Sequence, residues 1–144
     1  VYTLDIYGQV DSSQTQWFEN LQTTFPNYIE YKGVVDYDKS VEVLKNYFAL
    51  LFPTRFYTEG IPGTIIDAYA AGIPVIASKW ESFGDIVDDG ITGIGYDFQN
   101  QKHLVELMER MEKEQIDKMK TNCLSKGKSF LPNNVIGILK SRLI

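Results

Sequence analysis

Short apolar runs alternate with amphipathic segments along the chain. The segments between these runs have apolar residues at helical spacing or begin with residues that cap helices. Strands that alternate with helices predict an α/β domain built on a doubly wound parallel sheet of about five strands. The segments with the pattern of strands are 1–8, 28–35, 48–53, 73–78 and 92–97.

Helices are expected between these strands. Residues 11–25 place Trp17, Phe18, Leu21 and Phe25 at helical spacing after good capping residues. Asp38 is expected to cap a short helix, and a further helix is expected from about Pro62 to Ala71, with Gly72 just past its end. The remaining helices are expected around 82–88, over two segments with the apolar faces Leu104, Leu107, Met108, Met111 and Ile116, Met119, Cys123, and over 131–144.

The simplest right-handed arrangement of five such strands has the order 2-1-3-4-5, with the first strand paired in parallel with the third. Ligands of doubly wound sheets bind beyond the carboxyl ends of the strands, where the order reverses. The loops at this point are 8–12 and 53–62. Gly8, at the end of the first strand, is therefore a candidate substrate-binding residue.

Length and charge exclude several classes of protein. A chain of 144 residues is expected to form one domain with a core that needs no disulfide. The formal net charge of -5 argues against a nucleic-acid partner, which would require a basic surface. A small anionic ligand stays possible because it needs only a few backbone N–H groups and a helix end.

Cysteine use and hydropathy favour a cytoplasmic location. The single cysteine, Cys123, cannot form an internal disulfide. It is expected to be a half-buried helix residue rather than a nucleophile, since the only histidine, His103, lies on another predicted helix. No apolar run approaches the ~20 residues that span a bilayer, and no signal peptide is visible. Because the sequence begins at Val1 rather than at methionine, it is expected to be a fragment of a longer protein.

The segment "TEGIPGTIIDAYAAGIPVIAS" (58–78) holds the candidate chemistry. Gly60 and Gly63 flank a predicted helix start, where unpaired N–H groups carry partial positive charge. Glu59 and Asp67 could accept hydroxyls of a sugar on either side of that start. From spacing alone a structural explanation is favoured, in which Glu59 stabilises the helix N-terminus and Asp67 faces solvent.

The longer pattern resembles the signature of the family 4 retaining glycosyltransferases of the GT-B type. That signature begins with Glu-Gly, matched by Glu59 and Gly60, and has a second acid at the position of Asp67, usually glutamate. Downstream, "SFGDIVDDGITG" (82–93) is similar to a second family motif, with Asp85 in place of glutamate. The signature ends at matches for Ala68, Ala70, Gly72, Pro74, Val75, Ile76, Ala77 and Ser78.

The resemblance implies a nucleotide-sugar-binding domain whose partner is a nucleotide-diphosphate sugar. Glu59 would contact the donor sugar, backbone N–H groups of the Gly60–Ile61–Pro62–Gly63 segment would contact its hydroxyls, and Asp67 would hold the ribose. The loop 79–84, with Ser82, would lie near the nucleotide and its phosphates. No metal and no other cofactor are implied. The expected activity is transfer of a hexose to a glycan or lipid-linked acceptor, in polysaccharide biosynthesis.

The sequence departs from this family in what it lacks. The Arg and Lys that usually stabilise the leaving diphosphate, and the strand and helix that carry them ahead of "LDIYG", are not in the sequence, nor is the N-terminal acceptor-binding domain. The isolated chain is therefore expected to be inactive, and peripheral membrane association is left open for the full-length protein.

Two other functions remain open. A non-catalytic binding or interaction domain with the same fold would explain the missing basic pair and the shorter acids Asp67 and Asp85. A flavodoxin-like receiver or flavin domain is less well supported. "GQVDSSQT" (8–15) is not a flavin-phosphate loop, and Asp11 has almost no acidic neighbours to hold a metal.

Overall fold

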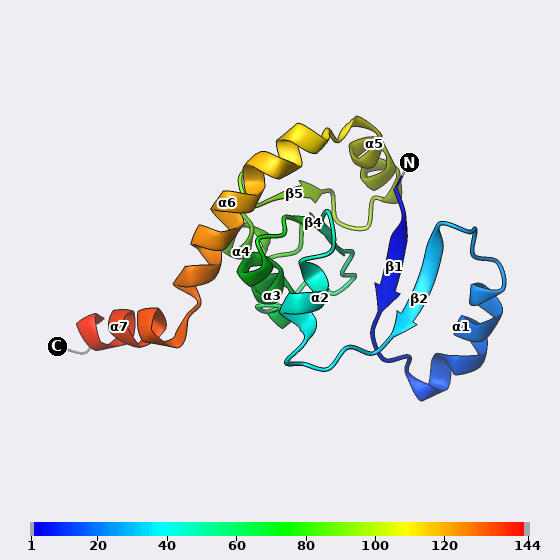
Figure 1. The fold of residues 1–144 in the computed structure, drawn as a ribbon, viewed down its shortest axis with the longest axis horizontal. Helices are drawn as coiled ribbons and strands as arrows, with labels where there is room; N and C mark the ends of the chain where they lie inside the picture. Colours follow the sequence, from blue (N-terminus) through cyan, green and yellow to red (C-terminus); the bar gives the residue numbers. More distant parts are fainter. Residues whose placement is uncertain (1, 143–144) are drawn as a thin grey trace. The chain divides into compact units, whose positions relative to one another are not determined.

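The computed structural model describes residues 2–142 of the chain. The chain divides into two compact units, an N-terminal unit (Val1–Lys39) and a C-terminal unit (Ser40–Ile144). Each unit has its own parallel sheet, of two strands in the first and three in the second (Figure 1). The predicted alternation of strands and helices, and with it the α/β class, is confirmed.

The N-terminal unit is a single strand–helix–strand crossover. β1 (Leu4–Tyr7) and β2 (Ile29–Gly33) pair in parallel, which a chain achieves only through a long connection. That connection contains η1 (Ser12–Gln14) and α1 (Thr15–Gln22). Asp11 begins it, because its carboxylate accepts the backbone N–H of Ser13 at 2.8 Å.

Aromatic packing holds α1 to β2, although only part of the predicted apolar stripe takes part. Phe18 packs edge-on against Tyr31 and Phe25, with ring centroids 4.9 and 6.3 Å apart. Trp17 is 62% exposed and Leu21 is 37% exposed. The helical spacing therefore predicted the helix correctly but predicted too many buried residues. A short helix on a two-stranded sheet can bury only one narrow stripe of its surface.

The C-terminal unit contains the larger sheet, with order β3-β4-β5 and all pairs parallel. Its strands are β3 (Leu50–Phe52), β4 (Val75–Ser78) and β5 (Gly93–Tyr96). Its helices are α2 (Ser40–Leu44), α3 (Gly63–Ala71), α4 (Phe83–Ile86), α5 (Gln101–Arg110), α6 (Lys113–Ser129) and α7 (Pro132–Arg142). The last two residues of the predicted C-terminal helix, 143–144, lie outside the described part of the chain.

Strand β4 is buried on both faces, as its continuous apolar run predicts. Val75 and Ala77 belong to a cluster that includes Ile65 of α3. Ile76 points to the opposite cluster, which includes Ile116 and Met119 of α6. Helices therefore cover both faces of the three-stranded sheet.

Helix α3 is held in place at its side and at its end. The buried hydroxyl of Tyr69 donates to the carbonyl of Ile86 at 3.0 Å and lies 3.1 Å from the hydroxyl of Thr92. Burial disfavours the phenolate and raises the pKa of Tyr69 to about 12. Gly72 ends the helix with a φ of 73°, a left-handed conformation in which glycine carries little strain, as predicted. Figure 1 shows α6 running alongside α3, against which it packs.

The predicted pairing of the first strand with the third is wrong. Among the described residues, β1 is bonded only to β2, while β3 is bonded only to β4. The parts 2-1 and 3-4-5 of the predicted order are each present, but in separate sheets. Apolar periodicity identifies strands along the chain, whereas pairing depends on which backbone edges meet in space, and the pattern does not contain that information.

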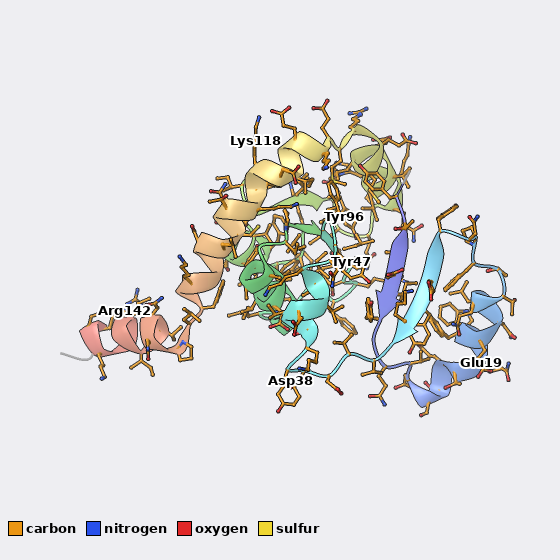
Figure 2. All side chains as sticks on the ribbon, viewed as in Figure 1. Glu19, Asp38, Tyr47, Tyr96, Lys118 and Arg142 are labelled. Carbon is orange, nitrogen blue, oxygen red and sulfur yellow. The ribbon has the colours of Figure 1, made fainter. Side chains whose placement is uncertain are left out.

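Two smaller predictions about helix starts also differ from the structure. Helix α2 begins at Ser40, two residues after Asp38, which therefore does not cap it (Figure 2 labels Asp38). Pro62 occupies the capping position directly before α3 rather than the first helical turn. Proline suits both positions because it has no N–H that would need a partner.

Cys123 lies on a helix, α6, as predicted, but it is more deeply buried than the half-buried position expected. Its side chain is fully buried, and its thiol donates to the carbonyl of Thr92 at 3.3 Å rather than to His103. Burial disfavours the thiolate and raises the pKa of Cys123 to about 12.

We expect Cys123 to resist alkylation in the folded protein. With its pKa at about 12, only roughly one thiol in ten thousand is the reactive thiolate at pH 8. Incubation with iodoacetamide followed by mass spectrometry should show almost no labelling in buffer and full labelling in urea. The exposed neighbour Ser125 offers a control, since Ser125→Cys should be labelled rapidly without urea. Rapid labelling of Cys123 in buffer would contradict this assignment.

Gly93 on β5 should not accept a side chain. A Cβ atom at this position would lie 2.3 Å from the backbone oxygen of Val75 on β4, so the strands would have to separate. Gly93→Ala should lower the free energy of unfolding by about 1–3 kcal/mol, measured by urea denaturation. Gly84→Ala is the matched control, because its Cβ would meet nothing within 4 Å and should leave stability nearly unchanged. Equal stability of the two variants would contradict the close approach of β4 and β5.

Candidate functional site

The candidate site lies where the loop 53–62 leads from the carboxyl end of β3 into α3. Because β3, β4 and β5 are parallel, their carboxyl ends share one edge of the sheet. Two hydrogen bonds fasten the loop to this edge. The hydroxyl of Ser78, at the end of β4, donates to the carbonyl of Thr54 at 2.8 Å, and the N–H of Glu81 donates to the carbonyl of Tyr57 at 2.9 Å.

Helix α3 begins without a side-chain cap. Pro62 has no polar side chain that could cap the helix, and its carbonyl accepts the N–H groups of Ile65 at 3.0 Å and Ile66 at 3.4 Å. Across residues 2–142, the backbone N–H groups of Gly63 and Thr64 have no recorded acceptor within the protein. The first N–H groups of a helix are also the positive end of its dipole. This exposed helix start can therefore accept oxygen atoms of a ligand.

The two candidate glycines leave space in front of these N–H groups. A Cβ atom on Gly60 or on Gly63 would meet nothing within 4 Å. Neither glycine is needed for a left-handed backbone conformation, since neither has a positive φ. Their structural role is thus small, and what they provide is access to the backbone. Ile61, which lies between Gly60 and Pro62, is 61% exposed.

Glu59 is fixed directly before this segment. It is half-buried, and its Oε2 atom accepts the hydroxyl of Thr54 at 3.3 Å. The same hydroxyl of Thr54 accepts the N–H of Phe56 at 3.1 Å. A carboxylate held by one weak bond keeps capacity to accept ligand hydroxyls.

Asp67 lies on α3 one turn after Gly63 and is half-buried. Its Oδ2 atom accepts the hydroxyl of Ser40, the first residue of α2, at 2.5 Å. Asp67 therefore does not simply face solvent, which was the structural alternative for this residue. Ser40 could not be identified from the sequence, because nothing in a local pattern connects two residues 27 positions apart.

The loop after β4 contributes buried apolar side chains and one cation. Trp80 packs edge-on against Phe52 and Phe83, with ring centroids 5.9 and 5.5 Å apart. In the described part of the chain the Nε1 atom of Trp80 is a buried donor with no partner. Lys79 pairs with Asp89 at 2.9 Å. Ser82 is half-buried directly before α4 and makes no capping bond with its side chain.

Tyr96 is the last residue of β5, at the carboxyl end of the sheet. It is almost fully buried in the C-terminal unit (Figure 2). Burial raises the pKa of Tyr96 because the phenolate would lose its hydration, although a hydrogen bond with Ser78 acts in the opposite direction. Tyr96 therefore stays a neutral hydroxyl at the end of β5.

Of the candidate residues, those from Glu59 to Gly63, Asp67 and Ser82 lie in the C-terminal unit. Gly8 lies in the N-terminal unit. Its carbonyl accepts the hydroxyl of Tyr31 at 2.7 Å, and its N–H donates to Gly33 at 3.0 Å. These two bonds fix the end of β1 within the N-terminal unit, and substrate binding by Gly8 stays a prediction.

Metal-binding and membrane-spanning features were sought in the same residues. Between residues 2 and 142, no three side chains of His, Cys, Asp or Glu are grouped so as to hold a metal ion. The described helices include none that is both long and apolar enough to cross a membrane. A surface hollow of ≈ 270 Å³ lies between β5, α5 and α6, and none of the candidate residues lines it.

Comparison with known proteins identifies relatives of this chain. A family model described as glycosyl transferases group 1 matches residues 1–130. An uncharacterized 41.2 kDa protein in the cps region of Klebsiella pneumoniae is 27% identical over 108 residues, which are 75% of this chain and 28% of that protein.

Solved structures share the fold. Sucrose-phosphate synthase from Thermosynechococcus elongatus matches with a TM-score of 0.74 and 20% identity, over 98% of this chain and 37% of the other. The pneumococcal O-GlcNAc transferase GtfA, solved with UDP and GlcNAc, matches with a TM-score of 0.69 and 20% identity, over 97% and 28%. The chain thus spans less than half the length of these proteins. Since the family model covers most of the sequence and the fold is that of GT-B enzymes, the chain belongs to the glycosyl transferases group 1 family.

Proposed function

We propose that residues 1–144 act as the nucleotide-sugar-binding domain of a retaining glycosyltransferase of family 4. The observation that carries the proposal is the uncapped start of α3, with open space at Gly60 and Gly63 and a carboxylate on either side. Exposed N–H groups and carboxylates together suit a ligand rich in hydroxyls and phosphate oxygens. A nucleotide-diphosphate sugar has both.

In this proposal Glu59 orients the donor hexose, the N–H groups of the segment 60–63 bind its hydroxyls, and Asp67 binds the ribose. Ser82 and its loop lie near the phosphates. During transfer the bond between the anomeric carbon and the diphosphate breaks and the acceptor oxygen bonds to that carbon, so negative charge develops on the diphosphate. Cations from outside this sequence would stabilise that charge, since Lys79 is paired with Asp89.

The acceptor is proposed to be a glycan or a lipid-linked glycan that is extended in the cytoplasm during polysaccharide biosynthesis. The Klebsiella relative in a cps region supports the polysaccharide part of this proposal. The pneumococcal transferase solved with UDP and GlcNAc supports a nucleotide-diphosphate sugar as the donor. An acceptor-binding domain would be needed for activity. The isolated chain should therefore have no transferase activity.

A non-catalytic binding domain is the second candidate. The ion pair between Lys79 and Asp89 favours it, because a lysine that is already paired is less able to stabilise a leaving diphosphate. A thermal-shift screen of the complete protein with nucleotide sugars separates the two functions. Binding with turnover supports the transferase, and binding without turnover in the presence of glycan acceptors supports the second candidate.

Replacing Glu59 should impair transfer. Glu59→Gln keeps the size of the side chain but removes its charge, and a hydrogen bond to a charged group contributes about 1.5–3 kcal/mol. We therefore expect kcat/KM of the complete protein to fall by about 10–100-fold. Glu109→Gln, on the exposed face of α5, is the control and should retain full activity. Unchanged turnover of Glu59→Gln would rule out a role for this carboxylate.

Adding a methyl group in front of the α3 N-terminus should block the ligand without harming the fold. A Cβ at position 63 meets nothing within 4 Å in the protein, so Gly63→Ala should keep its melting temperature. It should weaken binding of the nucleotide sugar about tenfold or more, because the ligand could no longer approach the backbone. Gly137→Ala in α7, which also has open space, serves as the control for both measurements. Tight binding by Gly63→Ala would show that the ligand lies elsewhere.

A further inference from the structure

The contact between α2 and α3 brings Ser40 next to Asp67. Ser40 is the first residue of α2, and Asp67 lies in the second turn of α3. The Ser40 hydroxyl lies 2.5 Å from the Oδ2 atom of Asp67, in a partly buried environment. The two helices pack against each other along their length, so this bond is part of a continuous contact.

The direction of this bond follows from the chemistry of the two groups. An ionised carboxylate only accepts, so the Ser40 hydroxyl donates, and hydrogen bonds to a charged acceptor are the short and strong ones. The carboxylate torsion of aspartate is otherwise broad and roughly two-fold. The bond from Ser40 selects one orientation and holds Oδ2.

The other carboxylate oxygen is left for a ligand. Within the described chain no donor to the Oδ1 atom of Asp67 is recorded, although the residue is half-buried. A partly buried acceptor without a protein partner is stabilised by a donor from outside. In the nucleotide-sugar site proposed above, that donor is a ribose hydroxyl.

We infer that Ser40 is a positioning residue that orients Asp67 to accept a ribose hydroxyl and thereby selects ribonucleotide over 2′-deoxyribonucleotide donors. This inference rests on the proposed function. Aspartate places its carboxylate one methylene nearer the helix than glutamate would, so its orientation matters more for reaching the sugar. Orienting the acceptor before the ligand arrives lowers the ordering cost of binding.

The test measures the binding of UDP, GDP and ADP, and of their 2′-deoxy counterparts, to the complete protein by titration calorimetry. The wild type should bind one ribonucleotide more tightly than its deoxy form. Ser40→Ala should weaken binding of that ribonucleotide about five- to tenfold and leave the deoxynucleotide nearly unchanged. Ser40→Thr, which keeps the hydroxyl, should restore the preference. Ser129→Ala, which removes an exposed hydroxyl on α6, is the matched control and should behave as the wild type.

The outcomes separate this inference from the proposed function. If no nucleotide binds to the wild type, the proposed function is wrong, and the inference falls with it. If the wild type binds but Ser40→Ala keeps the full ribose preference, Ser40 only links the two helices and the positioning role is overturned. Should Ser40→Ala unfold, Asp67→Asn provides the second measurement, because it keeps the shape of the side chain. It must lose the ribose preference, and an unchanged preference would overturn the inference.

Discussion

The burial of β4 on both faces is the constraint on which the candidate site depends. Each residue from Val75 to Ser78 is buried, and Val75 and Ala77 belong to one apolar cluster while Ile76 belongs to the other. A strand enclosed in this way cannot shift by one residue without moving its apolar set to the wrong face. The hydroxyl of Ser78 therefore has a fixed position, from which it holds the loop 53–62 through the carbonyl of Thr54.

The position of α3 follows from the same core. Ile65 and Tyr69 are fully buried, and the hydroxyl of Tyr69 is bonded on the far side to Ile86 and Thr92. With its side fixed, the helix does not need a capping side chain at its start, and Pro62 provides none. The N–H groups that a cap would normally satisfy stay available to a ligand. The packing of α3 in the core thus compensates for the missing cap at its N-terminus, which would make the helix less stable by itself.

Several parts of the site could be predicted from local sequence. Glycine before and at a helix start, acids around it and an apolar strand afterwards are features of neighbouring residues, and α3 indeed begins at Gly63 and is followed by the buried strand β4. Contacts between distant segments could not be predicted. Ser40 reaches Asp67 across 27 positions. Trp17 has the spacing of a core residue, yet it is 62% exposed because the sheet beneath its helix has only two strands.

The sequence by itself determined the α/β class, the helix end at Gly72, the buried strand β4 and the open helix start at Gly63, because each depends on side-chain chemistry within about ten residues. Only the tertiary structure decided that β1 pairs with β2, that the chain forms two compact units, and that Asp67 is held by Ser40. Backbone edges and distant side chains meet according to the packing of whole elements. A local pattern specifies which face of an element is apolar, but not which other element will cover it.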